Sequence, residues 1–376
     1  MNQAKVILSI GSNKGNRLEN ITRCIELIHN NLATVVSVSN LYETPSWGFV
    51  SDAFYNCAVL VHTTKSAEKL LEEILEAEKQ LGRIRSGEQG YQAREIDVDI
   101  IAYNEDIINL ENLQIPHPRM QDRRFVLLPM SDLQTDFVHP VLKKTIAELL
   151  RECKDDSSFA KVGKLENPLD KYDLKKFINI VIEGNIGAGK TTLATKISED
   201  FNAKLVLEGF ADNPFLPKFY EDQARYAFPL EMSFLADRYQ QLSDDLTQLD
   251  LFKNFIVADY YIFKSLIFAR VTLGEDEYRL YHKIFDIMYK EIPKPDLYVY
   301  LYQNTEQLLA NIKKRGRSYE QEIPSEYLDK INQGYLEYIK QQKDKDLNVL
   351  VIDVSDKDFV ENHQDYLAIL ELLSNS

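Results

Sequence analysis

The segment FINIVIEGNIGAGKTT, residues 177–192, decides the fold of the second half of this chain of 376 residues. Its aliphatic first half predicts a buried β-strand, and the glycine-rich turn that follows has the spacing of a P-loop. Backbone N–H groups of such a loop surround a phosphate, Lys190 adds a positive charge, and the Thr191 hydroxyl can bind Mg²⁺. We therefore predict that ATP is bound by Gly184, Asn185, Gly187, Gly189, Lys190, Thr191 and Thr192.

The P-loop lies near the middle of the chain, whereas P-loop domains usually begin with it. A chain of this length is expected to form two domains, and 44% hydrophobic residues are enough for two cores. Residues 149–176 carry charge clusters, serines and a proline but few apolar residues, which is typical of a linker. We predict a first domain at 1–158, a linker at 159–175 and a second domain at 176–376, with a short strand near 159–162 as the alternative within the linker.

Composition limits the classes of function. The net charge of −15 argues against broad nucleic-acid binding, because most of the surface would repel a phosphate backbone. Cys24, Cys57 and Cys153 lack the spacing of metal ligands, which predicts reduced thiols and a cytoplasmic protein. The sequence shows neither a secretory signal pattern nor a run of about 18 apolar residues, so no membrane span is expected.

The first half alternates short strands and helices. Residues 5–10, 35–41 and 57–62 have the pattern of strands, and residues 66–81 have the pattern of an amphipathic helix. A further helical pattern follows the first strand. This order predicts an α+β sandwich.

Two acidic residues alternate with apolar ones in the segment EIDVDII, residues 95–101. In a strand, Asp97 and Asp99 would share one face while Val98 points into the core. Neighbouring carboxylates repel each other unless a cation lies between them, so the pattern favours a Mg²⁺ site. A solvated strand face beside arginine residues is the alternative.

A series of short motifs in this half resembles 6-hydroxymethyl-7,8-dihydropterin pyrophosphokinase of folate biosynthesis over roughly residues 4–155. In the family's order, the motifs are Gly11-Ser12-Asn13, Tyr42-Glu43-Thr44-Pro45, Phe54-Tyr55-Asn56, Gly82-Arg83-Ile84-Arg85, REIDVDI at 94–100 and Pro116-His117-Pro118-Arg119-Met120. The resemblance implies a ferredoxin-like sandwich that transfers a diphosphate from ATP to a primary alcohol of the pterin.

The resemblance also implies roles for individual residues. Asp97 and Asp99 would hold two Mg²⁺ ions that bridge the ATP phosphates. The residues that would contact the phosphates are Arg83 and Arg94, as catalytic groups, and His117 and Arg123, as ATP ligands. The residues that would bind the pterin are Thr44, Phe54, Asn56 and Phe125, with the two phenylalanines stacked on its faces. One departure is Tyr91, where the family often has a tryptophan in a mobile loop.

The second half continues as repeated strand and helix units, which predict an α/β domain with a doubly wound parallel sheet. Residues 204–207 and 255–258 have the pattern of buried strands and are followed by the acids Glu208 and Asp259. Because ligands bind at the carboxyl ends of parallel strands, both acids are expected at the ligand-binding edge.

Two further segments carry candidate residues. The helical pattern at 229–246 places Glu231 and Arg238 near one face, where core packing is the alternative for its aromatic residues. Arg315 and Arg317 flank a glycine in a basic run, which is typical of a mobile lid that closes on ATP. A solvated charge run is the alternative for this segment.

Together these features resemble the deoxynucleoside kinase family over about residues 176–355. The residues whose roles it implies are Glu208 as the base for the nucleoside 5′-OH, Arg315 and Arg317 at the transferred phosphoryl group, Thr191 and Asp259 at one Mg²⁺, and Glu231 and Arg238 at the nucleoside. The residues predicted to be catalytic in this half are Glu208, Arg315 and Arg317.

Two departures from this family concern phosphate contacts and specificity. The family often reads the base with glutamine where this chain has Glu231, which can accept from the amine of adenine but needs a proton to donate to a ring nitrogen. Many relatives have an arginine after the acid, where this chain has Tyr260 and Tyr261. We expect purine deoxynucleosides as substrates, deoxyadenosine first, because a carboxylate would repel guanine O6.

The chain is thus predicted to be a bifunctional enzyme that uses MgATP as co-substrate at both sites, one for folate biosynthesis and one for nucleotide salvage. The alternatives for the second half are a nucleoside-monophosphate kinase and a non-catalytic nucleotide-sensing module. The expected partners are small molecules, and the resemblance implies a homodimer through the kinase domain.

Overall fold

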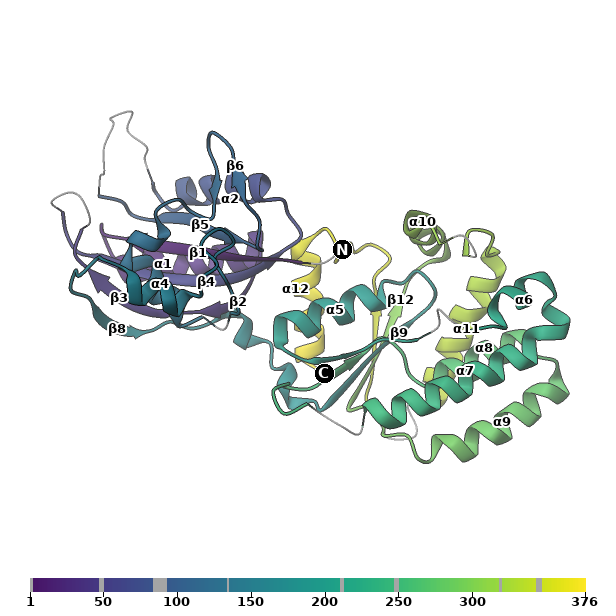
Figure 1. Cartoon of the computed structure of the whole chain (residues 1–376). Helices are drawn as coiled ribbons and strands as arrows, with labels where there is room; N and C mark the ends of the chain where they lie inside the picture. Colours follow the sequence, from purple (N-terminus) through teal and green to yellow (C-terminus); the bar gives the residue numbers. More distant parts are fainter. Residues whose placement is uncertain are drawn as a thin grey trace. The chain divides into compact units, whose positions relative to one another are not determined.

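The computed structural model describes residues 3–46, 51–83, 93–133, 135–209, 213–246, 250–317, 320–342 and 347–376. The chain forms two compact units, Met1–Tyr172 and Asp173–Ser376, and each is described by itself (Figure 1). Tyr91 lies outside the described residues.

The first unit is built on one antiparallel sheet of order β5-β1-β4-β3-β8, with β2 also paired to β4. Its strands are β1 (Ala4–Ser12), β2 (Thr34–Val38), β3 (Asn40–Thr44), β4 (Phe54–Thr63), β5 (Asp97–Tyr103) and β8 (Ala160–Lys164), beside a small hairpin of β6 (Ile108–Asn109) and β7 (Gln114–Ile115). The strand predicted at 35–41 is two strands, divided at Ser39, whose hydroxyl accepts the N–H of Ala58 at 2.9 Å.

Helices cover both faces of this sheet. On β1, Val6, Leu8 and Ile10 pack with residues of α1 (Arg17–Leu27) and α2 (Ala67–Gln80), while Ile7 packs with α3 (Arg124–Ser131) and α4 (Ile146–Glu152). The predicted α+β sandwich is confirmed. Burial on both faces explains why the strand sequence is almost continuously apolar.

β8 joins the first unit, in agreement with the alternative of a short strand near 159–162, although the sequence favours a linker from 159 to 175. It pairs antiparallel with β3, and Leu165 and Leu169 further along are buried. Its own residues are mostly exposed, because an edge strand buries little apolar surface, and so it carries no strong strand pattern. Residues 159–172 are thus packed against the first unit, which corrects most of the predicted linker.

The second unit contains a parallel sheet of order β10-β11-β9-β12-β13. Its strands are β9 (Asn179–Gly184), β10 (Lys204–Val206), β11 (Ile256–Ala258), β12 (Leu297–Tyr302) and β13 (Val349–Asp353). β9 comes first along the chain but lies in the middle of the sheet, so the loop that follows it opens at the centre of the carboxyl edge. The predicted doubly wound sheet is confirmed.

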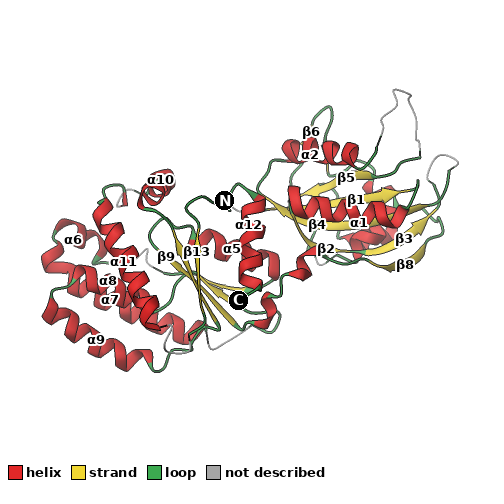
Figure 2. Ribbon diagram, turned by 180° about the vertical axis from the view of Figure 1, so that it is seen from behind, coloured by secondary structure: helices red, strands yellow, loops and turns green. Residues whose placement is uncertain are grey.

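Helices lie on both sides of this second sheet (Figure 2). α5 (Lys190–Phe201) and α12 (His363–Ser374) lie together on one side, joined by the Tyr366 hydroxyl, which donates to Asp200 at 2.7 Å. The helices on the other side are α7 (Gln223–Asp245), α8 (Phe263–Thr272), α9 (Glu275–Tyr289) and α11 (Ser325–Gln342), with the shorter α6 (Leu216–Glu221) and the helix α10 (Thr305–Arg315) nearby. Short 3₁₀ or π turns lie at Ile28–Leu32, Met120–Asp122, Pro168–Lys171 and Leu174–Lys176.

α7 begins earlier than the sequence predicts. The pattern predicts a helix from 229, but α7 starts at Gln223, where the Asp222 side chain accepts the N–H of Arg225 at 3.2 Å. Pro229 is therefore inside the helix, not at its start. The aspartate cap was a sufficient signal, and the proline obscured it.

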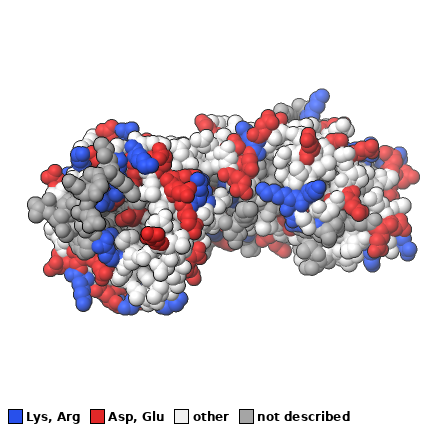
Figure 3. Space-filling view, turned by 90° about the horizontal axis from the view of Figure 1, so that it is seen from above, with Lys and Arg blue, Asp and Glu red and all other residues white. Residues whose placement is uncertain are grey.

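The surface carries both signs of charge. Figure 3 shows Asp and Glu side chains spread over both units, with Lys and Arg side chains among them. Within the described ranges, no helix combines the length and the apolar character that a membrane span requires.

Candidate active sites

The first candidate site lies where β5 begins. Asp97 and Asp99 are partly buried on one face, and Val98 between them belongs to the core. Burial and the nearby Asp97 carboxylate raise the pKa of Asp99 to about 6. A bound cation would relieve this repulsion, and carboxylate oxygens are ligands that suit Mg²⁺, so the pair fits the predicted metal site. In the described part of the chain, no group of three or more His, Cys, Asp and Glu side chains is placed to hold a metal ion.

Two of the predicted arginines contact Asp97. Arg83 lies 2.7 Å from Oδ1 and Arg94 lies 2.5 Å from Oδ2. Arg83 also pairs with Glu78, which is 1% exposed and accepts the N–H of Val98 at 2.9 Å. The structure thus places Glu78 as the residue that fixes Arg83 against the start of β5.

Asn13 of the Gly11-Ser12-Asn13 motif holds the backbone of Arg94 in place. Asn13 Oδ1 accepts the N–H of Arg94 at 2.7 Å, and the Asn13 N–H donates to the carbonyl oxygen of Arg94 at 3.1 Å. Its Nδ2 donates to the Ser51 hydroxyl at 2.9 Å. Asn13 therefore joins the chain before β4 to the chain before β5, a function that motif spacing alone did not indicate.

His117 and Arg123 lie near enough to the carboxylates of Asp97 and Asp99 to interact with them electrostatically. The His117 N–H donates to the carbonyl oxygen of Ile101 on β5 at 2.9 Å. Burial, followed by Arg123 and Arg119, lowers the pKa of His117 to about 4, so the ring is neutral at neutral pH. Its Nδ1 accepts the N–H of Arg119 at 3.3 Å, which leaves the ring proton on Nε2, where it can be donated. Arg123 is 5% exposed and acts electrostatically on both His117 and Asp99.

Three of the predicted pterin residues lie together on β3 and β4. Asn56 is buried, and its Nδ2 donates to the Thr44 hydroxyl at 2.7 Å. Gly11 on β1 leaves room for this group, since a Cβ there would lie 3.0 Å from Asn56 Oδ1 and 3.7 Å from the Phe54 ring. Phe125 comes from a different element, α3, and packs against the core between the sheet and α3 and α4.

The P-loop of the second unit has a backbone that only glycine adopts easily. Gly187 and Gly189 have φ of 84° and 86°. A Cβ on Gly184 would lie 2.8 Å from the carbonyl oxygen of Leu301, and one on Gly189 would lie 2.6 Å from the Phe359 ring. A larger residue at any of these three glycines would meet a steric obstacle or a strained backbone. The N–H groups of the loop lie at the start of α5, where an anion is favoured.

Asn185 is part of the P-loop, but its side chain serves the protein. Nδ2 donates to the carbonyl oxygen of Leu328 at 2.8 Å and to Asn332 Oδ1 at 2.9 Å, and Oδ1 accepts the N–H of Ile186 at 2.8 Å. Its backbone carbonyl accepts from Lys190 Nζ at 2.9 Å. The side chain ties the loop to α11, so any contact of Asn185 with ATP comes from its backbone.

Thr191 and Asp259, the two predicted Mg²⁺ ligands, are in contact. The Thr191 hydroxyl donates to Asp259 Oδ2, and Asp259 Oδ1 accepts the N–H of Glu208 at 2.8 Å. A hydroxyl and a carboxylate beside a P-loop fit one Mg²⁺ ion. Thr192 follows in the first turn of α5 and is half-buried.

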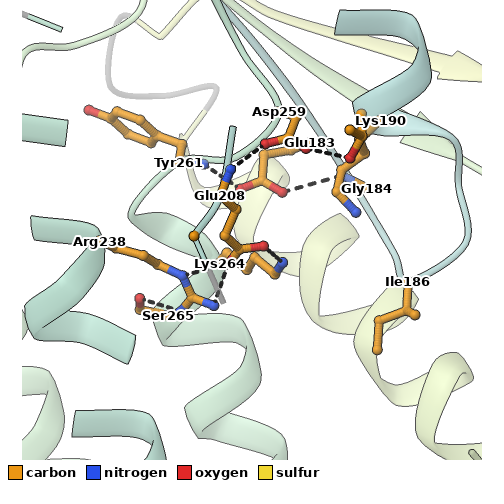
Figure 4. A network of polar contacts seen from close by, with 12 residues as sticks. Glu183, Gly184, Ile186, Lys190, Glu208, Arg238, Asp259, Tyr261, Lys264 and Ser265 are labelled. Carbon is orange, nitrogen blue, oxygen red and sulfur yellow. Dashed lines mark hydrogen bonds and ion pairs between the residues drawn. The ribbon is translucent and has the colours of Figure 1, made fainter. Parts of the chain in front are cut away.

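Glu208 is the centre of the polar network drawn in Figure 4. Arg238 donates to Oε1 from Nε at 2.9 Å and from Nη2 at 2.8 Å, and Lys264 donates to Oε2 from Nζ at 2.6 Å. Burial by itself would raise the pKa of Glu208, but Lys264 and Arg238 outweigh it and hold that pKa well below its ordinary value. The carboxylate is ionised at neutral pH and is held from two sides.

Sequence reasoning missed Lys264. It lies in the first turn of α8, and its N–H donates to the carbonyl oxygen of Tyr261 at 3.2 Å. Tyr260 and Tyr261, which stand where many relatives have an arginine, are fully buried core residues. Lys264 supplies a cation beside Glu208 in place of that arginine. Burial, followed by Lys264, lowers the pKa of Lys190 to about 8, which indicates that the two lysines lie near each other. A lone lysine in the largely apolar segment FKSLIFA, residues 263–269, was the available signal.

Glu231 lies further along α7 and is 3% exposed. Its Oε1 lies 2.9 Å from the Thr272 hydroxyl, and its Oε2 is buried without a hydrogen-bond partner among the described residues. Burial raises the pKa of Glu231 to about 7, although Arg238 acts in the opposite direction. Glu231 therefore differs from Glu208, whose two carboxylate oxygens both accept from cationic side chains.

The predicted lid arginines lie at the end of α10. Gly316 ends the helix with a φ of 73°, and Arg315 and Arg317 on either side both pair with Glu320. Glu320 is 6% exposed. The structure thus brings the two arginines together on one acid at the start of the segment that leads to α11.

Two known protein families match different parts of this chain. The model of the deoxynucleoside kinase family matches residues 180–375, which is about half of the chain, and the model of 7,8-dihydro-6-hydroxymethylpterin-pyrophosphokinase matches residues 7–135. The chain belongs to both families. The kinase half is 41% identical to deoxyguanosine kinase of Bacillus subtilis (strain 168) over 189 residues, which cover 50% of this chain and 91% of that protein.

Two further relatives agree with this assignment. The pyrophosphokinase half is 33% identical to 2-amino-4-hydroxy-6-hydroxymethyldihydropteridine pyrophosphokinase of Aquifex aeolicus (strain VF5), over 40% of this chain and 92% of that protein. The kinase half is also 31% identical to deoxyadenosine kinase of Dictyostelium discoideum, over 50% of this chain and 75% of that protein. The chain is therefore both a pterin pyrophosphokinase and a deoxynucleoside kinase, and relatives of its kinase half carry the names of two different purine nucleosides.

Proposed function

We propose that the kinase half transfers the γ-phosphoryl group of ATP to the 5′-OH of a purine deoxynucleoside, with deoxyadenosine preferred. The observation that supports this most strongly is the Glu208 carboxylate, which is ionised and held by Arg238 and Lys264 at the carboxyl edge of the sheet that carries the P-loop. An ionised carboxylate at this place can accept the proton of a neutral nucleoside hydroxyl.

In this reaction, the 5′-OH loses its proton to Glu208 as its oxygen forms a bond to the γ-phosphorus, and the bond between that phosphorus and the bridging oxygen of ADP breaks. Lys190 and the P-loop N–H groups would bind the phosphates, and Arg315 and Arg317 would leave Glu320 to approach the transferred group. Lys264 acts as a positioning residue for Glu208. Mg²⁺ at Thr191 and Asp259 would neutralise phosphate charge.

The pyrophosphokinase half is proposed to transfer a diphosphate from ATP to 6-hydroxymethyl-7,8-dihydropterin. Asp97 and Asp99 would hold two Mg²⁺ ions, which neutralise the triphosphate. The residues proposed to contact its phosphates are Arg83, Arg94, Arg123 and His117, the last as a neutral donor. The pterin would lie between Phe54 and Phe125, with Asn56 and the chain at Thr44 at its polar edge.

The kinase half is further proposed to form a homodimer in the cytoplasm. Leu280 and Ile287 on α9 are 51% and 70% exposed and lie seven residues apart, so they share one face of the helix. Sedimentation of the Leu280→Glu, Ile287→Glu double variant checks this: the proposal expects a shift to monomer, and an unchanged sedimentation coefficient would contradict it.

A phosphoryl-acceptor screen tests the kinase assignment. The full chain is incubated with MgATP and each of the four deoxynucleosides or dAMP, and products are separated by chromatography. We expect 5′-monophosphates of the purine deoxynucleosides, and loss of this product in Glu208→Gln. Phosphorylation of dAMP without phosphorylation of any deoxynucleoside would instead indicate a nucleoside-monophosphate kinase.

A further inference from the structure

The Glu231 carboxyl is a buried group with an unused oxygen. It lies on α7 among α8 and α9, 3% exposed, and Oε2 has no hydrogen-bond partner within the described residues. A buried acceptor without a partner is destabilising, so the arrangement favours a ligand that pairs with this oxygen. Arg238, two turns further along the same helix, is in contact with the proposed base Glu208, which places Glu231 on the helix that borders the acceptor site.

The contact with Thr272 accommodates both protonation states of Glu231. The Thr272 hydroxyl lies 2.9 Å from Glu231 Oε1 and 3.0 Å from the carbonyl oxygen of Phe268. A threonine hydroxyl has one proton, so it can donate to only one of these oxygens at a time. When it donates to Glu231, Oε1 acts as an acceptor in both protonation states, and the proton of a neutral carboxyl is left on Oε2, the oxygen without a partner in the described residues.

The charged groups around Glu231 are balanced. Arg238 on α7 and Lys264 on α8 both favour the ionised form, but each is already paired with Glu208, at 2.8 and 2.6 Å. From α9, the Tyr281 hydroxyl lies 3.4 Å from the backbone carbonyl of Glu231, and burial raises the pKa of this tyrosine, so it stays neutral. Burial, the largest influence, raises the pKa of Glu231 to about 7. Both forms of Glu231 are populated near neutral pH.

The two forms are complementary to different purines. Adenine presents an acceptor, N1, beside a donor, the N6 amine, and a neutral carboxyl offers one donor and one acceptor. Guanine presents two adjacent donors, N1–H and the N2 amine, and a carboxylate offers two acceptors. A carboxylate that meets this edge does not face O6, so the repulsion expected from the sequence applies only to a base held by its O6 edge. We propose that the protonation state of Glu231 selects the nucleobase, with the neutral form favouring deoxyadenosine and the ionised form favouring deoxyguanosine. This inference rests on the proposed function and names the feature of the same site that sets its specificity.

The test is the ratio of kcat/KM for deoxyadenosine to kcat/KM for deoxyguanosine, measured with the full chain and MgATP from about pH 6 to pH 8.5. Titrations that affect both reactions alike cancel in this ratio. Because Glu231 loses its proton as the pH rises, the ratio should fall by about 10-fold or more across the range.

Two variants make the test specific. Glu231→Gln keeps one donor and one acceptor but does not titrate, so its ratio should favour deoxyadenosine and stay constant with pH. Asp237→Asn removes an exposed carboxylate from the same helix and should keep the pH dependence of the unmodified chain. Phosphorylation of both substrates with a ratio that does not change with pH would overturn this inference and leave the proposed function intact. Phosphorylation of neither substrate would overturn the proposed function itself.

Discussion

The two proposed ATP sites of this chain are built in opposite ways. The pyrophosphokinase half uses side chains: Asp97 is matched by Arg83 and Arg94, and the charges gather at the edge of an antiparallel sheet. The kinase half uses its backbone: glycines shape a loop at the centre of a parallel sheet, and Lys190 adds one cation. A site made of side chains should fail when one charge is removed, whereas a site made of backbone should fail when a Cβ is added.

Removal of Asp97 should have the largest effect. Asp97→Ala takes away a proposed metal ligand and leaves Arg83 and Arg94 without their shared counter-charge. Loss of several kcal/mol of charge stabilisation corresponds to a fall of about 10³- to 10⁴-fold in AMP formation from ATP and the pterin alcohol. Kinase activity of the same preparation should be unchanged, and Asp106→Asn, an exposed carboxylate in the same unit, should change neither.

Glu208→Gln should impair the kinase reaction and leave the pyrophosphokinase reaction unchanged. The amide cannot accept the 5′-OH proton, and we expect kcat for the deoxynucleoside to fall about 10²- to 10³-fold while AMP formation in the other half continues. The measurement is initial rates of both reactions on one preparation. Equal losses in the two reactions would show that the halves are coupled and would break the comparison.

Lys264 should have a smaller effect that can be separated from packing. Lys264→Met removes one of the cations that hold Glu208, and we expect kcat to fall about 10- to 100-fold, as for other supporting residues. Because Lys264 lowers the pKa of Glu208, its loss should raise that pKa and move the acidic limb of the kcat profile to higher pH. Lys264→Arg should restore both rate and profile. A lower rate with an unshifted profile would assign Lys264 a packing role only.

The smallest effect tests the backbone site. Gly189→Ala and Gly316→Ala both place an alanine at positive φ, which costs about 1–2 kcal/mol of stability. Only the first meets an obstacle, the Phe359 ring at 2.6 Å, whereas nothing lies within 4 Å of a Cβ at Gly316. Gly189→Ala should therefore show the lower Tm and a higher KM for ATP in the kinase reaction. Equal Tm values for the two variants would argue that the ring moves away without cost.

Sequence periodicity predicted the positions of acids better than those of cations. Alternation placed Asp97 and Asp99 on one face, and the ends of parallel strands placed Asp259 beside Thr191, because both rules follow from backbone geometry. Lys264 was missed because it is an isolated charge in the first turn of a largely apolar helix, and its partner Glu208 is 56 residues away. The protonation of Glu231 escaped because it depends on burial, which a helical pattern alone does not quantify.

β8 determines where the chain can be divided. A fragment that ends at residue 158 lacks the partner of β3, whose Asn40 and Leu41 pair with Lys164 and Gly163. An uncovered edge strand presents a row of free N–H and C=O groups and promotes aggregation, so this fragment should precipitate on concentration. A fragment that ends at Tyr172 keeps the edge covered and should remain monodisperse. We therefore expect the pyrophosphokinase, as a separate protein, to need for its solubility a strand that lies beyond residues 7–135, the part that the family model matches.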